Sequence, residues 1–209
     1  MAPSSTQSRF TIPIDSARPK GAARFEFLAP KIGRRVTLFT PLQVRLWALL
    51  ESVPSVSAYC ERPAFWEKAG GRQLTDFWVK AGRHETYWIV TADARPGLAG
   101  ALSSVDSINV RYIHAESLAS HCVWIENWMR ILPYLAANAR FVNNKLLNDV
   151  ERMSLAAPTF AEIEREFQPH DIVLVRTAVF MLLHRGRIKA KALREQPLGS
   201  GIVFRRSLS

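Results

Sequence analysis

Asp76 is the residue of this chain best suited to bind a metal ion. It lies in the run Leu74–Val79 (Leu-Thr-Asp-Phe-Trp-Val), where the apolar residues after Asp76 predict a buried strand. A carboxylate at the start of such a strand can bind Mg²⁺, and the ion can then orient a scissile phosphate. The alternative is an ordinary aspartate that begins a strand.

The layout of residues 40–91 resembles that of metal-dependent nucleases of the PD-(D/E)xK type, which carry a second acid on the preceding helix, predicted here over 41–51. Spacing puts Gln43 at that place, and its neutral amide oxygen is a poor Mg²⁺ ligand. Thr40 and Gln43 also match a capping box, which predicts a structural role. Glu51 is a displaced candidate acid, although a glutamate at the end of a helix is more simply a solvated residue.

The same chemistry needs an acid and a lysine two residues apart on the last strand, predicted over 86–91. Ile89 and Thr91 hold these two places. Ile89 cannot bind a metal, and Thr91 cannot supply a cation to the attacked phosphate. Lys80 is a candidate replacement lysine, and its alternative role is a solvated residue at a strand end.

Other catalytic classes find little support. The five histidines do not form a zinc-binding pattern, and the chain contains no P-loop and no nucleophile elbow. Cys60 and Cys122 lack metal-ligand spacing, which favours reduced thiols in a cytoplasmic protein, with one disulfide as the alternative. No apolar run is long enough to cross a membrane, so we expect no membrane partner.

The net charge of +10 is concentrated at the two ends of the chain. Residues 1–40 hold seven basic and two acidic side chains, residues 185–209 hold seven basic and one acidic, and the region between is nearly neutral. Concentrated charge of this kind favours a polyanionic partner such as DNA over simple solubility. The predicted DNA-binding residues are Arg34, Arg35, Arg185, Arg187, Lys189, Lys191, Arg205 and Arg206.

Three regions are expected along the chain. Residues 1–23 are predicted to form a flexible basic arm, residues 24–155 a main α/β domain, and residues 156–209 a small C-terminal domain, with the boundary inside 148–158. The main domain is read as one helix followed by mainly antiparallel strands, including one over 74–80 and one over 108–113, and then helices over 117–129 and 133–144.

The C-terminal region reads as helix, helix, basic segment, glycine turn and basic strand. Thr159 and Glu162 form a capping box, an apolar helix over 171–184 stops at Arg185-Gly186, and a strand is predicted over 202–206. This order is typical of a winged-helix-like module.

Three segments together resemble a known family. They are Thr40–Leu50 with Gln43, Val53–Pro63 with Tyr59, and Leu74–Val79 with Asp76. They look like the N-terminal domain of TnsA-type transposon-end endonucleases, which have a PD-(D/E)xK, restriction-endonuclease-like fold. The segment 171–206 is similar to the winged-helix-like C-terminal domain of that family, so the resemblance covers residues 25–206.

The resemblance implies an enzyme that cuts the 5′ ends of a transposon beside a DDE-family transposase, under an AAA+ regulator. Carried over, its metal-binding Glu falls on Gln43, its Asp on Asp76, its Glu or Gln on Ile89 and its Lys on Thr91. Only Asp76 matches. We therefore expect a non-catalytic subunit that binds transposon-end DNA and a transposase. Two alternatives stay open: an active Mg²⁺-dependent endonuclease with a rearranged site, and a winged-helix DNA-binding regulator.

Overall fold

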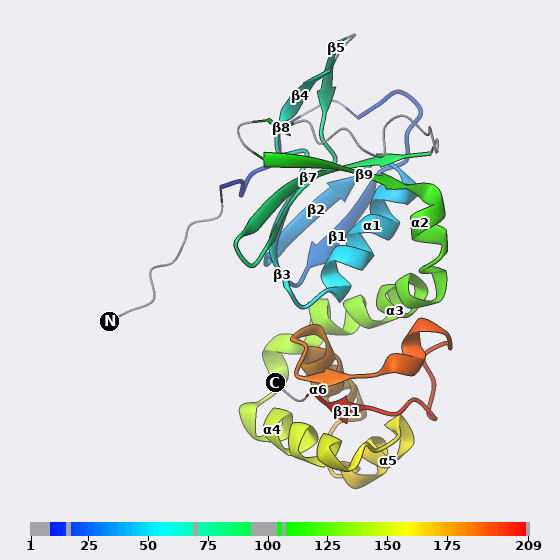
Figure 1. The fold of residues 1–209 in the computed structure, drawn as a ribbon. Helices are drawn as coiled ribbons and strands as arrows, with labels where there is room; N and C mark the ends of the chain where they lie inside the picture. The colour runs from blue at the N-terminus through cyan, green and yellow to red at the C-terminus, as the bar shows by residue number, and fades with distance from the viewer. Residues whose placement is uncertain (1–8, 16–17, 69–70, 93–103, 106–107, 208–209) are drawn as a thin grey trace. The chain divides into compact units, whose positions relative to one another are not determined.

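The computed structural model describes residues 9–15, 18–68, 71–92, 104–105 and 108–207. These residues form a mixed α/β fold with six α-helices (Figure 1). The chain divides into two compact units. The predicted division at residue 155 falls inside the second unit and stays a prediction. The first unit comprises Met1–Phe27, Arg35–Leu46 and Ser55–Ala119, and the second comprises Leu28–Arg34, Trp47–Pro54 and Ser120–Ser209.

The first unit is built on a five-stranded sheet in the order β3-β6-β7-β9-β8. Neighbouring strands run antiparallel, as predicted, except β7 and β9, which are parallel. The sequence gives no sign of this parallel pair, because tertiary packing decides which strands become neighbours and in which direction they pair. The strands are β3 (Val56–Glu61), β6 (Phe77–Ala81), β7 (His84–Thr91), β8 (Ser104–Val105) and β9 (Ile108–His114).

One face of this sheet carries an apolar cluster. Side chains alternate between the two faces of a strand, and the strand register brings the large side chains of one face together. The ring of Phe10 packs 5.6 Å from that of Trp78, between ring centroids. Phe10 belongs to the predicted arm 1–23, of which residues 1–8 and 16–17 lie outside the described residues. The buried members of the cluster are Cys60, Trp78, Tyr87, Ile89 and Val110.

Helix α1 (Pro41–Ser52) begins as the sequence predicts. The hydroxyl of Thr40 accepts from the backbone N–H of Gln43 at 3.1 Å, and the Gln43 side-chain oxygen accepts from the Thr40 N–H at 3.2 Å. Each partner thereby satisfies a backbone donor that the start of a helix leaves open. The two-stranded ribbon before the helix is formed by β1 (Phe25–Ala29) and β2 (Arg34–Leu38).

The strand predicted over 74–80 is wrong as a single element. Leu74 ends β5 (Gly71–Leu74), which pairs with β4 (Phe65–Lys68), and β6 begins only at Phe77. The break has a physical cause in two backbone hydrogen bonds. The N–H of Thr75 donates to Ala64, and the carbonyl of Asp76 accepts from Arg62. Residues 75–76 therefore separate β5 from β6, and Asp76 directly precedes β6, which pairs with β3 on one side and β7 on the other.

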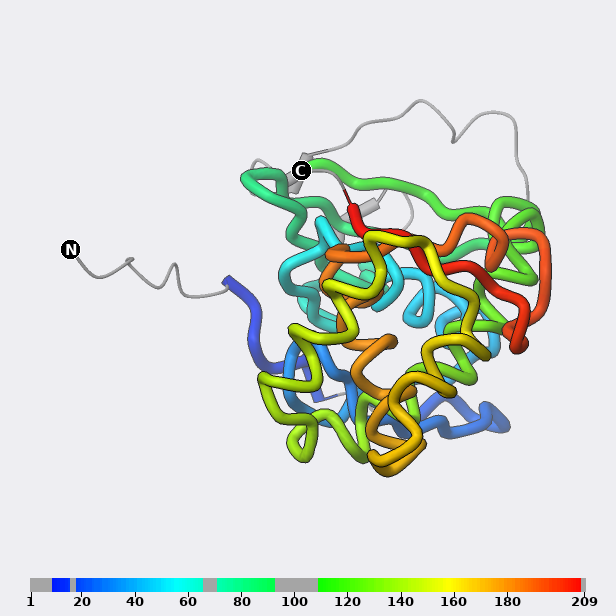
Figure 2. The backbone as a smooth tube through the Cα atoms, turned by 90° about the horizontal axis from the view of Figure 1, so that it is seen from below, coloured from blue at the N-terminus to red at the C-terminus, as the bar shows by residue number. Residues whose placement is uncertain are grey.

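The second unit contains three long helices and a C-terminal ribbon. The helices are α3 (Cys122–Asn138), α4 (Asn144–Met153) and α6 (Ile172–His184), and the shorter α5 (Phe160–Glu166) precedes α6. Both α3 and α4 pack against α6. Figure 2 follows the chain from the green-yellow α4 through the orange α6 to the red C-terminal segment. The strands β10 (Ile188–Lys189) and β11 (Arg205–Arg206) pair antiparallel, with η3 (Lys191–Arg194) between them.

The bounds predicted for two helices in this part of the chain are wrong. In place of helices over 117–129 and 133–144, α2 (Ala115–Ala119) is short and α3 runs through Pro133. Proline costs a helix one backbone hydrogen bond, and the burial of Trp128, Ile131 and Leu135 on either side outweighs that loss. The segment 148–158, in which the domain boundary is predicted, begins inside α4, and that helix ends at Met153.

The strand predicted over 202–206 is shorter than expected, since only Arg205–Arg206 forms β11. The capping box of α5 and the stop of α6 at Arg185-Gly186 are confirmed: Asp171 caps α6, and Gly186 has the positive φ of 72° that favours glycine. Among the helices of the described residues, none is both long and apolar enough to cross a membrane.

Candidate functional site

The structure brings two of the predicted site residues into contact. The side-chain Nε2 of Gln43, on α1, donates to Oδ1 of Asp76 at 2.6 Å. Both residues belong to the first unit and are half-buried. The spacing argument that paired the helix position with Asp76 is therefore confirmed, although the chemistry of the pair differs from that of two acids.

The orientation of the Gln43 amide is fixed by its other end. Its Oε1 accepts from the backbone N–H of Phe39 at 2.8 Å and from that of Thr40 at 3.2 Å. An amide flipped by 180° would turn its NH₂ group toward these two donors. The NH₂ group of Gln43 therefore faces Asp76, whereas a side chain that binds a metal ion has to direct an oxygen lone pair at the ion.

The second oxygen of the Asp76 carboxylate is also engaged. Oδ2 accepts from the backbone N–H of Val90 at 2.7 Å. Burial raises the pKa of Asp76, and the bonds from Gln43 and Val90 act in the opposite direction. Two neutral donors thus hold the carboxylate in the place where a cation would bind.

The two predicted site positions on β7 hold Ile89 and Thr91, and neither side chain carries an acid or a cation. Ile89 is 2% exposed and belongs to the apolar cluster of the sheet. Thr91 is half-buried and stands opposite His114 in the register of β7 and β9. The register of β6 and β7 pairs Phe77 with Trp88, so Asp76 stands next to Ile89 across the strands. The residue next to Asp76 on β7 is therefore apolar.

Lys80 does not replace the missing lysine. It is half-buried within β6, with Ala58 and Glu85 opposite it on the neighbouring strands. Three residues of strand carry it roughly 10 Å beyond Phe77, the residue that follows Asp76. The described residues contain no group of three or more His, Cys, Asp or Glu side chains that could hold a metal ion. The residues at Asp76 do not fit Mg²⁺.

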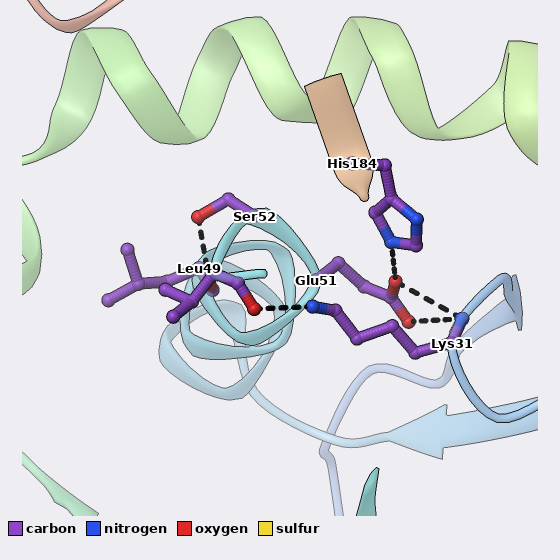
Figure 3. Close-up of polar contacts among 6 residues, drawn as sticks. Lys31, Leu49, Glu51, Ser52 and His184 are labelled. Atoms are coloured by element: carbon purple, nitrogen blue, oxygen red, sulfur yellow. Dashed lines mark hydrogen bonds and ion pairs between the residues drawn. The ribbon is translucent and has the colours of Figure 1, made fainter. Parts of the chain in front are cut away.

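Glu51 occupies a different environment from the solvated helix end that we expected. It is fully buried in the second unit, and that expectation is wrong. Figure 3 shows its contacts with Lys31 and His184. Its carboxylate lies 2.8 Å from Nε2 of His184, and it accepts from the backbone N–H of Lys31 at 3.3 and 3.4 Å. The sequence could not reveal this network, because His184 is 133 residues away from Glu51.

Lys31 completes this cluster. Its Nζ donates to the carbonyl of Val53, just beyond the end of α1, at 2.5 Å, where a cation also suits the negative end of the helix dipole. Burial lowers the pKa of Lys31 to about 8, against the opposing charge of Glu51. The side chains tie the β1–β2 turn to the ends of α1 and α6, so the cluster has a structural role and supplies no acid to Asp76.

The predicted basic residues fall into two groups. Arg187 and Arg206 both form ion pairs with Glu151, which is only 6% exposed. The charge of Glu151 is therefore shared by two arginines, and their assignment to DNA is weakened. Arg34 is half-buried on β2, and the exposed residues of the set that form no ion pair with Glu151 are Arg35, Arg185, Lys189, Lys191 and Arg205.

Compared with models of known protein families and with curated proteins, the chain matches none.

Proposed function

We propose that this chain is a non-catalytic, TnsA-like subunit of a DNA transposition complex. Its first unit would be a restriction-endonuclease-like domain with a closed metal position, and its second unit would include a winged-helix-like DNA-binding module. The proposed partners are transposon-end DNA, a DDE-family transposase and an AAA+ regulator. The resemblance of the segments around Gln43, Tyr59 and Asp76 supports this family assignment.

One observation carries the non-catalytic part of the proposal. The amide of Gln43 donates to Asp76, and its orientation is fixed by two backbone N–H groups at its other end. Phosphate cleavage by this class of enzyme needs a cation between two acids and a lysine nearby. At the corresponding places this chain has a hydrogen-bond donor, Ile89 and Thr91.

The alternative of an active enzyme with a rearranged site has less support. It requires Glu51 to act with Asp76 and Lys80, but the Glu51 carboxylate is engaged by Lys31 and His184 in the second unit. A fully buried acid with these partners would have to leave them to reach a substrate. Removing one partner of a buried charged pair is strongly unfavourable.

The alternative of a sequence-specific regulator also has less support. A recognition helix must present polar side chains to base edges, whereas α6 is buried along most of its length. The residues exposed in its first turn are the apolar Ile172 and Val173. Reading of bases by this helix is therefore disfavoured.

The deciding experiment is cleavage of supercoiled plasmid by the full-length protein with Mg²⁺ or Mn²⁺, with binding to linear duplex measured on the same samples. We expect DNA binding without nicking, for the wild type and for Asp76→Ala alike. Asp15→Ala, which removes an exposed aspartate of the same unit, is the matched control. Nicking that is lost in Asp76→Ala and kept in Asp15→Ala would overturn the proposal.

A further inference from the structure

The C-terminal ribbon places two cations opposite each other. In the register of β10 and β11, Lys189 faces Arg205, and both residues are exposed. Like charges directly opposite each other on antiparallel strands repel and destabilise the pair. An anion that lies across the ribbon would remove this repulsion, so the arrangement favours an anionic partner.

The base of the ribbon is held in place by a separate set of contacts. Glu151 on α4 accepts from Nε of Arg187 at 2.9 Å and lies 3.5 Å from Nε of Arg206. The backbone N–H of Ser207 donates to the carbonyl of Arg187 at 2.8 Å. These arginines are anchored against an acid, whereas Lys189 and Arg205 carry charge that no acid in the described ion pairs neutralises. The ribbon is thus a supported element with a cationic outer pair.

The neighbouring helix cannot supply base recognition. Eight of the residues of α6 are buried, in a continuous run from Thr177 to Leu183 together with Val175. Direct readout of the major groove requires donors and acceptors on an exposed helix face. The two exposed cations of the ribbon suit contacts with phosphates, which carry no sequence information.

We infer that the β10–β11 ribbon binds the sugar–phosphate backbone of duplex DNA through Lys189 and Arg205, independently of base sequence. This inference rests on the proposed function, since it names the surface by which the subunit contacts DNA. Glu151 acts as a positioning residue, because it fixes the two arginines that flank the cationic pair. The ribbon supplies affinity, and the choice of DNA site falls to the partner proteins.

The test uses full-length protein and two duplexes of equal length and unrelated sequence, with binding followed by fluorescence anisotropy over a range of salt concentrations. The variant is the double substitution Lys189→Gln and Arg205→Gln. The matched control is Lys145→Gln with Arg152→Gln, which removes two charges from residues of the same unit that are 84% and 76% exposed at the side chain. Circular dichroism checks that both variants fold.

We expect the ribbon variant to bind both duplexes more weakly, by about the same factor. The slope of log affinity against log salt should fall by about 2, since each lost phosphate contact removes about 0.9 from it. The control should keep the wild-type slope. A ribbon variant with the wild-type slope, or one weakened on only one duplex, would overturn the inference while leaving DNA binding intact. Wild-type protein that binds neither duplex would overturn the proposed function as well.

Discussion

Gln43 and Asp76 are 33 residues apart in the chain, and their side chains meet at 2.6 Å, with Nε2 of the amide donating to Oδ1 of the carboxylate. The contact connects α1 to the residue that directly precedes β6. The single substitution Gln43→Glu replaces the amide by a carboxylate, so the contact can be tested by experiment.

Gln43→Glu should lower the free energy of unfolding at neutral pH by about 1–3 kcal/mol, because it turns a donor into a second buried acid facing Asp76. Burial already raises the pKa of Asp76, and a second acid would raise it further. The loss should therefore appear as the pH rises through the raised pKa and disappear in acid, where one of the two acids is protonated. Chemical denaturation at pH 4 and pH 7 measures it.

The same variant should gain a response to divalent cations. With two acids at the site, Mn²⁺ should raise the Tm of Gln43→Glu and leave that of the wild type unchanged, because only the variant offers two anionic ligands. Gln73→Glu makes the same charge change at an exposed residue of β5 and should show neither effect. If Gln43→Glu is as stable as the wild type at pH 7 and insensitive to Mn²⁺, the geometry of the pair is wrong.

Glu51→Gln should destabilise the protein by on the order of 2 kcal/mol, because the fully buried carboxylate is bonded by Lys31 and lies beside His184. Urea denaturation at neutral pH gives this value. Glu166→Gln, at the exposed end of α5, should change stability by less than about 0.5 kcal/mol. Equal stability of the two variants would contradict a structural role for Glu51.

Lys31→Met should remove a pH-dependent contribution to stability. The folded-state pKa of Lys31 is lowered from 10.5 to about 8, so between these values the unfolded chain binds more protons than the folded one. The free energy of unfolding of the wild type should therefore rise with pH across this window, by at most about 3 kcal/mol. The full destabilisation by Lys31 should be present below pH 8. The difference between wild type and variant, measured by denaturation at pH 7.5 and pH 10.5, isolates Lys31 from other groups.

Lys20→Met replaces an exposed lysine and is the control for the Lys31 experiment. Its stability should follow the wild-type pH dependence throughout. A wild type and a Lys31→Met variant whose stabilities change in parallel between these pH values would show that the Lys31 amine is solvated in the folded protein.

The sequence predicted the elements whose signals are local. The capping boxes at Thr40 and Thr159 follow from residue types three positions apart, and the structure confirms both. The stop of α6 at Gly186 was also predictable, because it depends on a turn residue. Local backbone chemistry decides all of these.

Contacts between distant parts of the chain decided the rest. Neither the burial of Glu51 against His184 nor the capture of Arg187 and Arg206 by Glu151 has a sequence signal, because each joins elements tens of residues apart. Helix α3 passes through Pro133 because burial of its neighbours outweighs a local preference to break. The sequence by itself determined which residues could do chemistry, and only packing determined that Asp76 faces a donor and that Glu51 is engaged elsewhere.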